Sequence, residues 1–321
     1  MSFAAETKRE LATIYDESRE CRVAELSALI RMNGTINLSN QKVILEVQTE
    51  NAAIARKIFT LIKDVFEVSA EIMVRKKMRL RKNNIYVVRL LNDVEQVLRD
   101  LRIVETGFVF SPRIDLALIK ETLCKRAYLR GAFLAGGSIN NPDSGSYHLE
   151  ISASYQEHAE DLTKLANYFK LNAKWNERKK GYFIYLKEGE KISDFLSVVG
   201  AHQALLKFED VRIVRDIRNS VNRIVNCEKA NLKKISDTGV RQSENIRLID
   251  REIGLRNLPV RLQEIAELRL QYPESSLQEL GELVPSGKIS KSGVNHRLRK
   301  LDEIAGKLRG DVDDEQTTGN I

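Results

Sequence analysis

Apolar and polar residues along the first two hundred positions follow one order of patterns, and this order occurs twice. In the first run, apolar residues at helical spacing predict helices over about 5–33 and 51–66. Alternating apolar and polar residues predict paired strands over 35–48 and 70–91. The second run predicts helix, strands, helix and strands over about 116–135, 137–154, 157–170 and 172–187. The sequence therefore predicts an α-β-β-α-β-β unit in duplicate, which is an α+β fold.

The duplication is visible in the residues as well as in the order of elements. Residues 26–36 align with residues 129–139 at an offset of 103 (129 minus 26). Cys21 also aligns with Cys124, and residues 45–47 align with residues 149–151. Two copies of one unit predict a single domain with pseudo-two-fold symmetry. We expect the first copy to span about 5–95 and the second about 116–205. The domain that contains both is expected over 1–206.

The chain changes character after about residue 205. Residues 207–256 contain no proline and carry many charges, and their helical spacing predicts connecting helices with a break at Thr238-Gly239. The apolar stripe of this segment consists of Val211, Val214, Ile217, Val221, Ile224 and Val225. Short helices are expected over 257–310. The acidic tail, 311–321, is expected to be disordered.

Residues 275–308 have the layout of a helix-turn-helix. Ser275 or Ser276 caps a short helix with Glu279 near the capping-box position, and a turn over 285–288 precedes a longer helix. In this motif the N-terminal residues of the second helix enter the major groove, where Asn and Arg suit contacts with bases. The candidate DNA-binding residues are Ser290, Lys291, Ser292, Asn295, His296, Arg297, Arg299 and Lys300. The alternative is an ordinary three-helix bundle with a basic surface, because the turn is longer than in the tightest helix-turn-helix.

Basic residues also gather on one face of a strand in each copy. In the first copy Ile72 and Val74 share an apolar face, and a run of Arg and Lys occupies the other face. In the second copy Leu171 and Trp175 mark the apolar face. The candidate phosphate-binding residues are Arg75, Lys77, Arg79, Arg81, Lys174, Arg178 and Lys180. The alternatives are a solvated outer face without a partner and a surface that binds an acidic protein.

Composition narrows the class of protein. The 321 residues are 42% apolar and 30% charged, which predicts a soluble globular protein of two or three domains. The net charge of +7 is a modest basic excess, so the distribution of charge says more about partners than the total does. Three cysteines make no disulfide framework and no apolar run reaches the length of a membrane span, which excludes secreted and membrane proteins. We expect no metal, no other cofactor and no small-molecule substrate, because the histidines lack ligand spacing.

The first half of each copy resembles the LAGLIDADG homing endonuclease signature. In that family two helices pack through small residues, here Ala28 and Gly131, and the helix ends bring together two acidic residues that hold a divalent metal. A saddle of antiparallel strands grips the duplex. Here Asn33 and Gly136 stand at the acidic positions, and neither recruits a hard cation well. The resemblance therefore implies a nuclease fold without nuclease chemistry and no catalytic residues.

A degenerate LAGLIDADG pair followed by a helix-turn-helix resembles the WhiA family of bacterial regulators. The resemblance extends to about Arg309, and it is most specific in the Asn-rich segment 218–234 and in the expected recognition helix, 290–301. It implies a non-enzymatic protein of the cytoplasm and nucleoid that binds double-stranded DNA and acts in cell division, chromosome segregation or transcription. Another transcription factor or a division protein is an expected partner. The alternatives are a scaffold for division proteins with incidental DNA binding and an active metal-dependent homing endonuclease.

Overall fold

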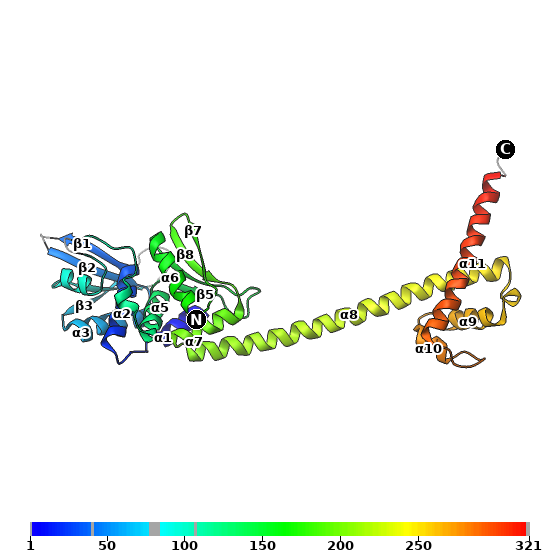
Figure 1. Cartoon of the computed structure of the whole chain (residues 1–321), viewed down its shortest axis with the longest axis horizontal. Helices are drawn as coiled ribbons and strands as arrows, with labels where there is room; N and C mark the ends of the chain where they lie inside the picture. The colour runs from blue at the N-terminus through cyan, green and yellow to red at the C-terminus, as the bar shows by residue number, and fades with distance from the viewer. Residues whose placement is uncertain (1, 40–41, 77–83, 106–107, 319–321) are drawn as a thin grey trace. The chain divides into compact units, whose positions relative to one another are not determined.

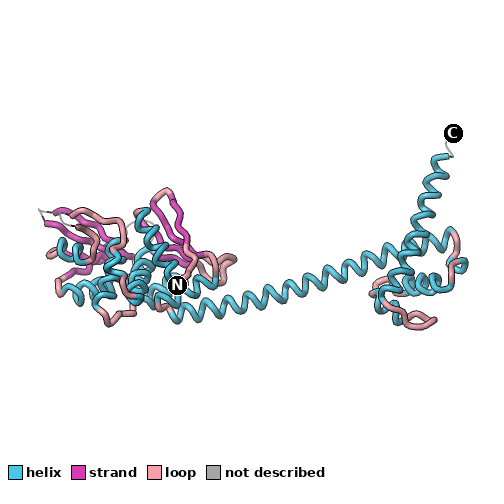
Figure 2. Tube along the Cα trace, viewed as in Figure 1, coloured by secondary structure: helices cyan, strands magenta, loops and turns pink. Residues whose placement is uncertain are grey.

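The protein folds into two compact units, Met1–Asp216 and Ile217–Ile321. In the computed structural model the described residues are 2–39, 42–76, 84–105 and 108–318. Strands occur in the first unit, and the described elements of the second unit are helical (Figures 1 and 2). The α+β fold expected from the sequence is confirmed, with a duplicated domain preceding a helical one.

Each copy in the first unit builds a four-stranded antiparallel sheet with helices on it. The elements of the first copy are α1 (Phe3–Leu11), α2 (Arg19–Asn33), β1 (Gly34–Ser39), β2 (Lys42–Thr49), α3 (Ala52–Phe66), β3 (Ala70–Lys76), β4 (Asn84–Leu90) and α4 (Val94–Asp100). Those of the second copy are η1 (Leu116–Ile119), α5 (Thr122–Gly136), β5 (Gly137–Ile139), β6 (Leu149–Ala153), α6 (Gln156–Tyr168), β7 (Lys174–Arg178), β8 (Gly181–Leu186) and α7 (Gly189–Val199). The strand orders are β1-β2-β4-β3 and β5-β6-β8-β7, so the two sheets have the same topology.

Helices α2 and α5 pack against each other at the centre of the unit because small residues let their backbones approach. A Cβ added at Gly131 would lie 2.4 Å from the carbonyl oxygen of Glu25 and 3.0 Å from the Cβ of Ala28. Only glycine fits at this position. The aligned thiols of Cys21 and Cys124 also meet here, with their Sγ atoms 2.6 Å apart. Residues that align at this offset in the sequence therefore occupy equivalent places on the two sides of the pseudo-two-fold axis.

The apolar face expected on the first basic strand is only partly covered. The pairing places Ile72 opposite Val88 and Val74 opposite Tyr86, so the period of two is confirmed for the described residues. Ile72 is nevertheless 39% exposed and Val74 53% exposed. The reason is that β3 is an edge strand, with a neighbour on one side only. Trp175 on β7, the other sheet's edge strand, is exposed to a similar extent (37%).

One long helix, α8 (His202–Glu252), replaces the two connecting helices that we expected. Its described apolar stripe lies in solvent, and Val214, Ile217, Val221 and Ile224 are between 52% and 60% exposed. The expected break at Thr238-Gly239 is wrong. Gly239 is instead a contact point, because a Cβ there would lie 1.8 Å from the carbonyl oxygen of Pro273.

The last turns of α8 belong to the core of the second unit. The remaining elements are η2 (Leu255–Asn257), α9 (Val260–Gln271), α10 (Leu277–Glu282) and α11 (Lys291–Thr318). Ile246 and Ile249 of α8 are buried with Ile265 of α9, Leu280 of α10 and Val294 of α11. The segment expected to be a connector thus supplies a core helix. The tail was expected to be disordered, but α11 continues through it as a helix to Thr318.

Candidate DNA interface

The positions of the two catalytic carboxylates in the LAGLIDADG signature carry no carboxylate. Asn33 ends α2 and Gly136 ends α5. The amide nitrogen Nδ2 of Asn33 donates to the carbonyl oxygen of Ala135 at 3.3 Å, so this side chain bridges the two helix ends. A Cβ added at Gly136 would lie 2.7 Å from the Oγ of Ser152 and 2.9 Å from its carbonyl oxygen. No larger side chain fits there without a shift of the neighbouring strand.

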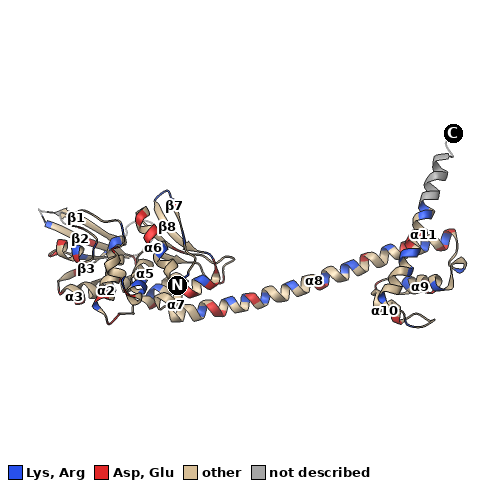
Figure 3. Ribbon diagram, viewed as in Figure 1, with Lys and Arg blue, Asp and Glu red and all other residues tan. Residues whose placement is uncertain are grey.

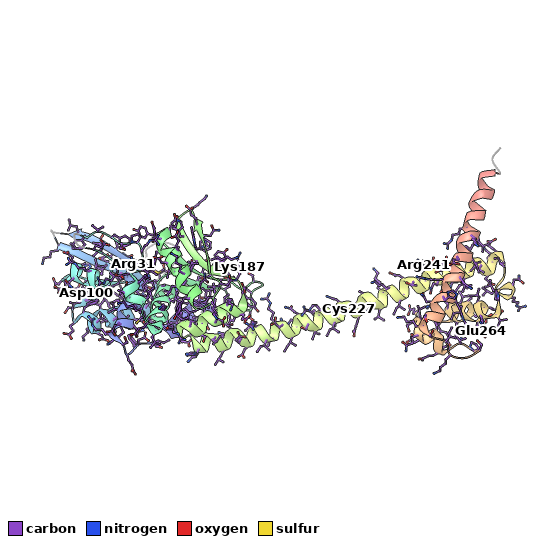
Figure 4. The ribbon with its side chains drawn as sticks, viewed as in Figure 1. Arg31, Asp100, Lys187, Cys227, Arg241 and Glu264 are labelled. Carbon is purple, nitrogen blue, oxygen red and sulfur yellow. The ribbon has the colours of Figure 1, made fainter. Side chains whose placement is uncertain are left out.

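The other acidic position of the first signature is occupied by Arg31, labelled in Figure 4. The Arg31 side chain donates to the carbonyl oxygen of Arg102 at 2.6 Å and to that of Ser111. It therefore fastens the segment between the copies instead of holding a metal. Within the described part of the chain, no cluster of three or more His, Cys, Asp or Glu side chains is arranged to hold a metal ion.

On the first sheet, the basic stripe is partly neutralised. The register places Arg75 and Arg89 on the same face as Glu46. Arg75 lies 3.2 Å from the Oε1 atom of Glu46, and the Nε atom of Arg89 donates to the same oxygen at 3.0 Å. Glu46 is only 6% exposed, so two arginines share one buried carboxylate. The other candidates of this stripe, Lys77, Arg79 and Arg81, lie outside the described residues.

The second sheet repeats the arrangement with Glu150 and Arg178. The two Arg178 amino groups donate to the Glu150 carboxylate at 2.6 and 3.1 Å, and His148 lies 3.0 Å from it. These partners, Arg178 first, hold the pKa of Glu150 below its ordinary value. Lys174 and Lys180 are exposed, and Lys180 lines a cavity of about 310 Å³ together with Asn33 and Gly136.

The equivalence of Glu46 and Glu150 was missed in the sequence, although the signal was present. Both glutamates lie in the aligned segments 45–47 and 149–151, at the polar position between two apolar residues. Each ends up on the sheet face that carries the basic stripe. A repeated acidic residue on a basic face predicts internal ion pairs as well as phosphate contacts.

The helix-turn-helix is built by α9, α10 and α11. Ser276 and Glu279 form a reciprocal capping box that begins α10, where either Ser275 or Ser276 was expected. The turn returns close to α10, and the amide of Ile289 donates to the carbonyl oxygen of Gly281 at 3.0 Å. A Cβ at Gly281 would lie 2.4 Å from the carbonyl oxygen of Ile289. This close approach explains the glycine at that position.

The candidate residues on α11 fall into two groups. Ser292, His296 and Arg299 are exposed at helical spacing, on the side opposite the buried Val294 and Leu298. Ser290, Lys291 and Lys300 are also exposed, and Asn295 is half-buried. Lys and Arg lie along this helix in Figure 3. The first turns of α11 thus present a polar and basic face.

Arg297 does not share this exposed face. Its side chain is 17% exposed, and it donates to the carbonyl oxygen of Arg261 at 3.3 Å. It also lies 3.9 Å from the carboxylate of Glu264, which is labelled on α9 in Figure 4 and accepts a hydrogen bond from Ser286. In the structure Arg297 therefore ties α11 to α9. Arg297 and Arg299 therefore lie on different sides of α11.

Together, the two units define a class of protein: a LAGLIDADG-type domain with a degenerate catalytic centre, joined to a helix-turn-helix domain. Sequence models of three domains match the chain. They are the WhiA N-terminal LAGLIDADG-like domain over residues 19–104, the WhiA LAGLIDADG-like domain over 125–218 and the WhiA C-terminal HTH domain over 221–305. The chain belongs to the WhiA family.

Comparisons with individual proteins agree with this membership. The chain is 62% identical to the "Probable cell division protein WhiA" of Bacillus licheniformis over 310 residues, which cover 96% of this chain and 98% of the relative. Identity to the Bacillus subtilis protein of the same name is 60% over 310 residues, with the same coverage of both chains. The crystal structure of full-length DUF199/WhiA from Thermatoga maritima is similar with a TM-score of 0.58 and 28% identity, covering 96% of this chain and 99% of that one. Among the described residues, no helix combines the length and apolar character that crossing a membrane requires.

Proposed function

We propose that this protein is a non-enzymatic, DNA-binding regulator of bacterial cell division. The observation that carries the proposal is the exposed face at the start of α11, formed by Ser292, His296 and Arg299. In a helix-turn-helix the first turns of the second helix meet the major groove, and Arg and Asn make bidentate contacts with guanine and adenine. The name of the relatives supports a role in cell division.

Within this proposal the candidate residues take different roles. Arg299, His296 and Asn295 read base edges. The exposed basic residues and hydroxyls around these three contact phosphates, and these are Ser290, Lys291, Ser292 and Lys300. Arg297 positions α11 through its bond to Arg261. Activity in the cytoplasm at the nucleoid, in chromosome segregation or in transcription forms part of the same proposal.

The first unit has a secondary part in this proposal. Lys174 and Lys180 extend the contact with the DNA backbone, whereas the charges of Arg75 and Arg178 are largely compensated by Glu46 and Glu150. This compensation, like the exposed apolar stripe of α8, favours the second candidate function, a surface for another division protein or transcription factor. The lack of a carboxylate at Asn33 and Gly136 argues against cleavage of DNA.

The test is duplex binding by the full chain, with magnesium present so that nicking would be seen. Random and genomic duplexes are titrated at several salt concentrations with the parent, Arg299→Ala and the control Arg256→Ala. Arg256 is an exposed arginine of the same unit, in η2. We expect Arg299→Ala to lose about 1–3 kcal/mol on the preferred sequence and to relax base preference. Equal binding by all three proteins would refute the assignment of α11 as the reading helix.

A further inference from the structure

The second unit contains a cationic cavity that the reading face does not use. It has a volume of about 320 Å³ and lies where α8, the end of α9 and the starts of α10 and α11 meet. The residues that matter for its chemistry are Lys234, Thr238, Arg269, Ser275, Ser276 and Lys291. Three cations and three hydroxyls thus line it, and none of the described lining residues is acidic.

Arg269 gives the cavity a buried positive charge that has no counter-ion in the described part of the chain. The residue is 2% exposed, and burial lowers the pKa of its guanidinium. One amino group donates to the carbonyl oxygens of Ser275 at 2.7 Å and Pro273 at 3.2 Å. Its Nε has no hydrogen-bond partner among the described residues. Because burying a charge without an opposite charge is unfavourable, an anion in the cavity would offset that cost.

The cavity is held rigidly by the contact between α8 and the loop after α9. Gly239 packs directly on the carbonyl of Pro273, which is itself an acceptor of Arg269. Ser243, one turn further along α8, donates to the carbonyl oxygen of Arg269 at 3.5 Å. On the same helix Thr238 directly precedes Gly239, and Lys234 lies five residues before it. Arg269 is therefore placed before any ligand arrives.

We propose that this cavity binds one phosphate of the DNA backbone beside the groove that α11 reads. This inference rests on the proposed function. Lys291, which lines the cavity, is also the first residue of α11, so the cavity adjoins the reading face. Phosphate contacts fix the register of a protein on the duplex, and hydroxyls, Lys and Arg are the groups that make them. A soluble phosphate has the same chemistry and is the other source of the anion.

The first experiment compares two neighbouring lysines of α8 in the full chain. Lys234 lines the cavity, whereas Lys233 is exposed and does not, so Lys234→Ala and Lys233→Ala remove the same charge at adjacent positions. Affinity for one duplex is measured against salt concentration. We expect Lys234→Ala to reduce the slope of log K against log salt by about 1, uniformly across sequences, and Lys233→Ala to leave the slope unchanged. Equal slopes for the two variants would overturn the inference. The proposed function would still stand in that case, because it depends on duplex binding by the parent.

The second experiment separates the two sources of phosphate. Duplex and inorganic phosphate are titrated separately into the parent and into Lys234→Ala, and the NMR resonance of the Arg269 Nε–H is followed in each titration. We expect bound duplex to move this resonance in the parent and inorganic phosphate to move it far less. If inorganic phosphate moves it fully and the parent binds no duplex, the proposed function fails and the backbone source is overturned. A resonance that moves with neither ligand also overturns the proposal.

Discussion

Arg130 and Glu25 join the two copies of the duplicated domain through a buried two-point ion pair. The Nε atom and an amino group of Arg130 each lie 3.0 Å from an oxygen of Glu25, and the two residues are 4% and 0% exposed. Lys57 lies 2.8 Å from the same carboxylate, and Asp16 completes the group on Arg130. Lys57 of α3 and Arg130 of α5 thus both depend on Glu25 of α2.

Glu25→Gln is expected to destabilise the first unit strongly, because it leaves Lys57 and Arg130 buried beside a neutral side chain. Removing one partner of a buried ion pair typically costs about 3–5 kcal/mol. The control is Glu95→Gln in the exposed pair with Arg99 on α4, where a loss of about 0.3–0.5 kcal/mol is expected. Urea unfolding is followed by fluorescence of Trp175, the single tryptophan of the chain. Similar losses in both variants would contradict the prediction.

Restoring acidic residues at the closed centre is expected to give instability and no nuclease. Gly136→Asp, with or without Asn33→Asp, forces a side chain against the backbone of Ser152, and overpacking of this kind costs about 1–3 kcal/mol. Cleavage of a duplex in magnesium and unfolding of the protein are both measured. Gly145→Ala is the control, because a Cβ at Gly145 meets nothing within 4 Å. A stable double variant that nicks DNA would show that the centre is open.

Stability of the first unit is expected to fall as the pH falls below about 6.5, in part through His158. Burial lowers the pKa of His158 to about 3, and its Nε2 atom lies 3.1 Å from the hydroxyl of Tyr128. Between these two pH values the unfolded chain binds a proton that the folded chain does not. The free energy of unfolding therefore drops by up to about 1.4 kcal/mol per pH unit from this residue.

The check is urea unfolding of the parent and His158→Gln at pH 7.5 and pH 5.0. Other groups that titrate in this range affect both proteins equally, so the difference in pH dependence isolates the histidine. We expect the parent to lose more stability than the variant on acidification. Parallel losses would show that His158 takes up its proton in the folded protein.

Two glycines on helices of the second unit are expected to respond oppositely to alanine. Gly239→Ala places a methyl group 1.8 Å from the carbonyl oxygen of Pro273, so it is expected to separate α8 from the loop after α9. Gly306→Ala meets nothing within 4 Å and removes the flexibility of glycine from a helix, which stabilises by about 0.5–1 kcal/mol. Hydrogen exchange of α9 measures both effects. Faster exchange in Gly306→Ala, or unchanged exchange in Gly239→Ala, would contradict this account.

Local pattern in the sequence was sufficient for much of this protein. Period-two and helical spacing, repeated at one offset, predicted the duplicated domain, and the aligned Cys21 and Cys124 meet in the structure. Turn and capping residues predicted the helix-turn-helix around Ser276 and Glu279. The loss of acidic residues at Asn33 and Gly136 followed from the resemblance to the LAGLIDADG signature, whereas the other features were found in this chain alone. These features depend on residues close together in the chain, or on a comparison of the chain with itself.

Tertiary structure decided which charged residues face solvent and which are already paired. Arg75 meets Glu46 across a sheet, and Arg297 turns toward Arg261 on another helix, so neither partner follows from spacing along one element. Gly239 was interpreted as a helix break, but its role comes from Pro273, which approaches it from a distant loop. A sequence records the period of each element, whereas the partner of a side chain depends on how separate elements pack.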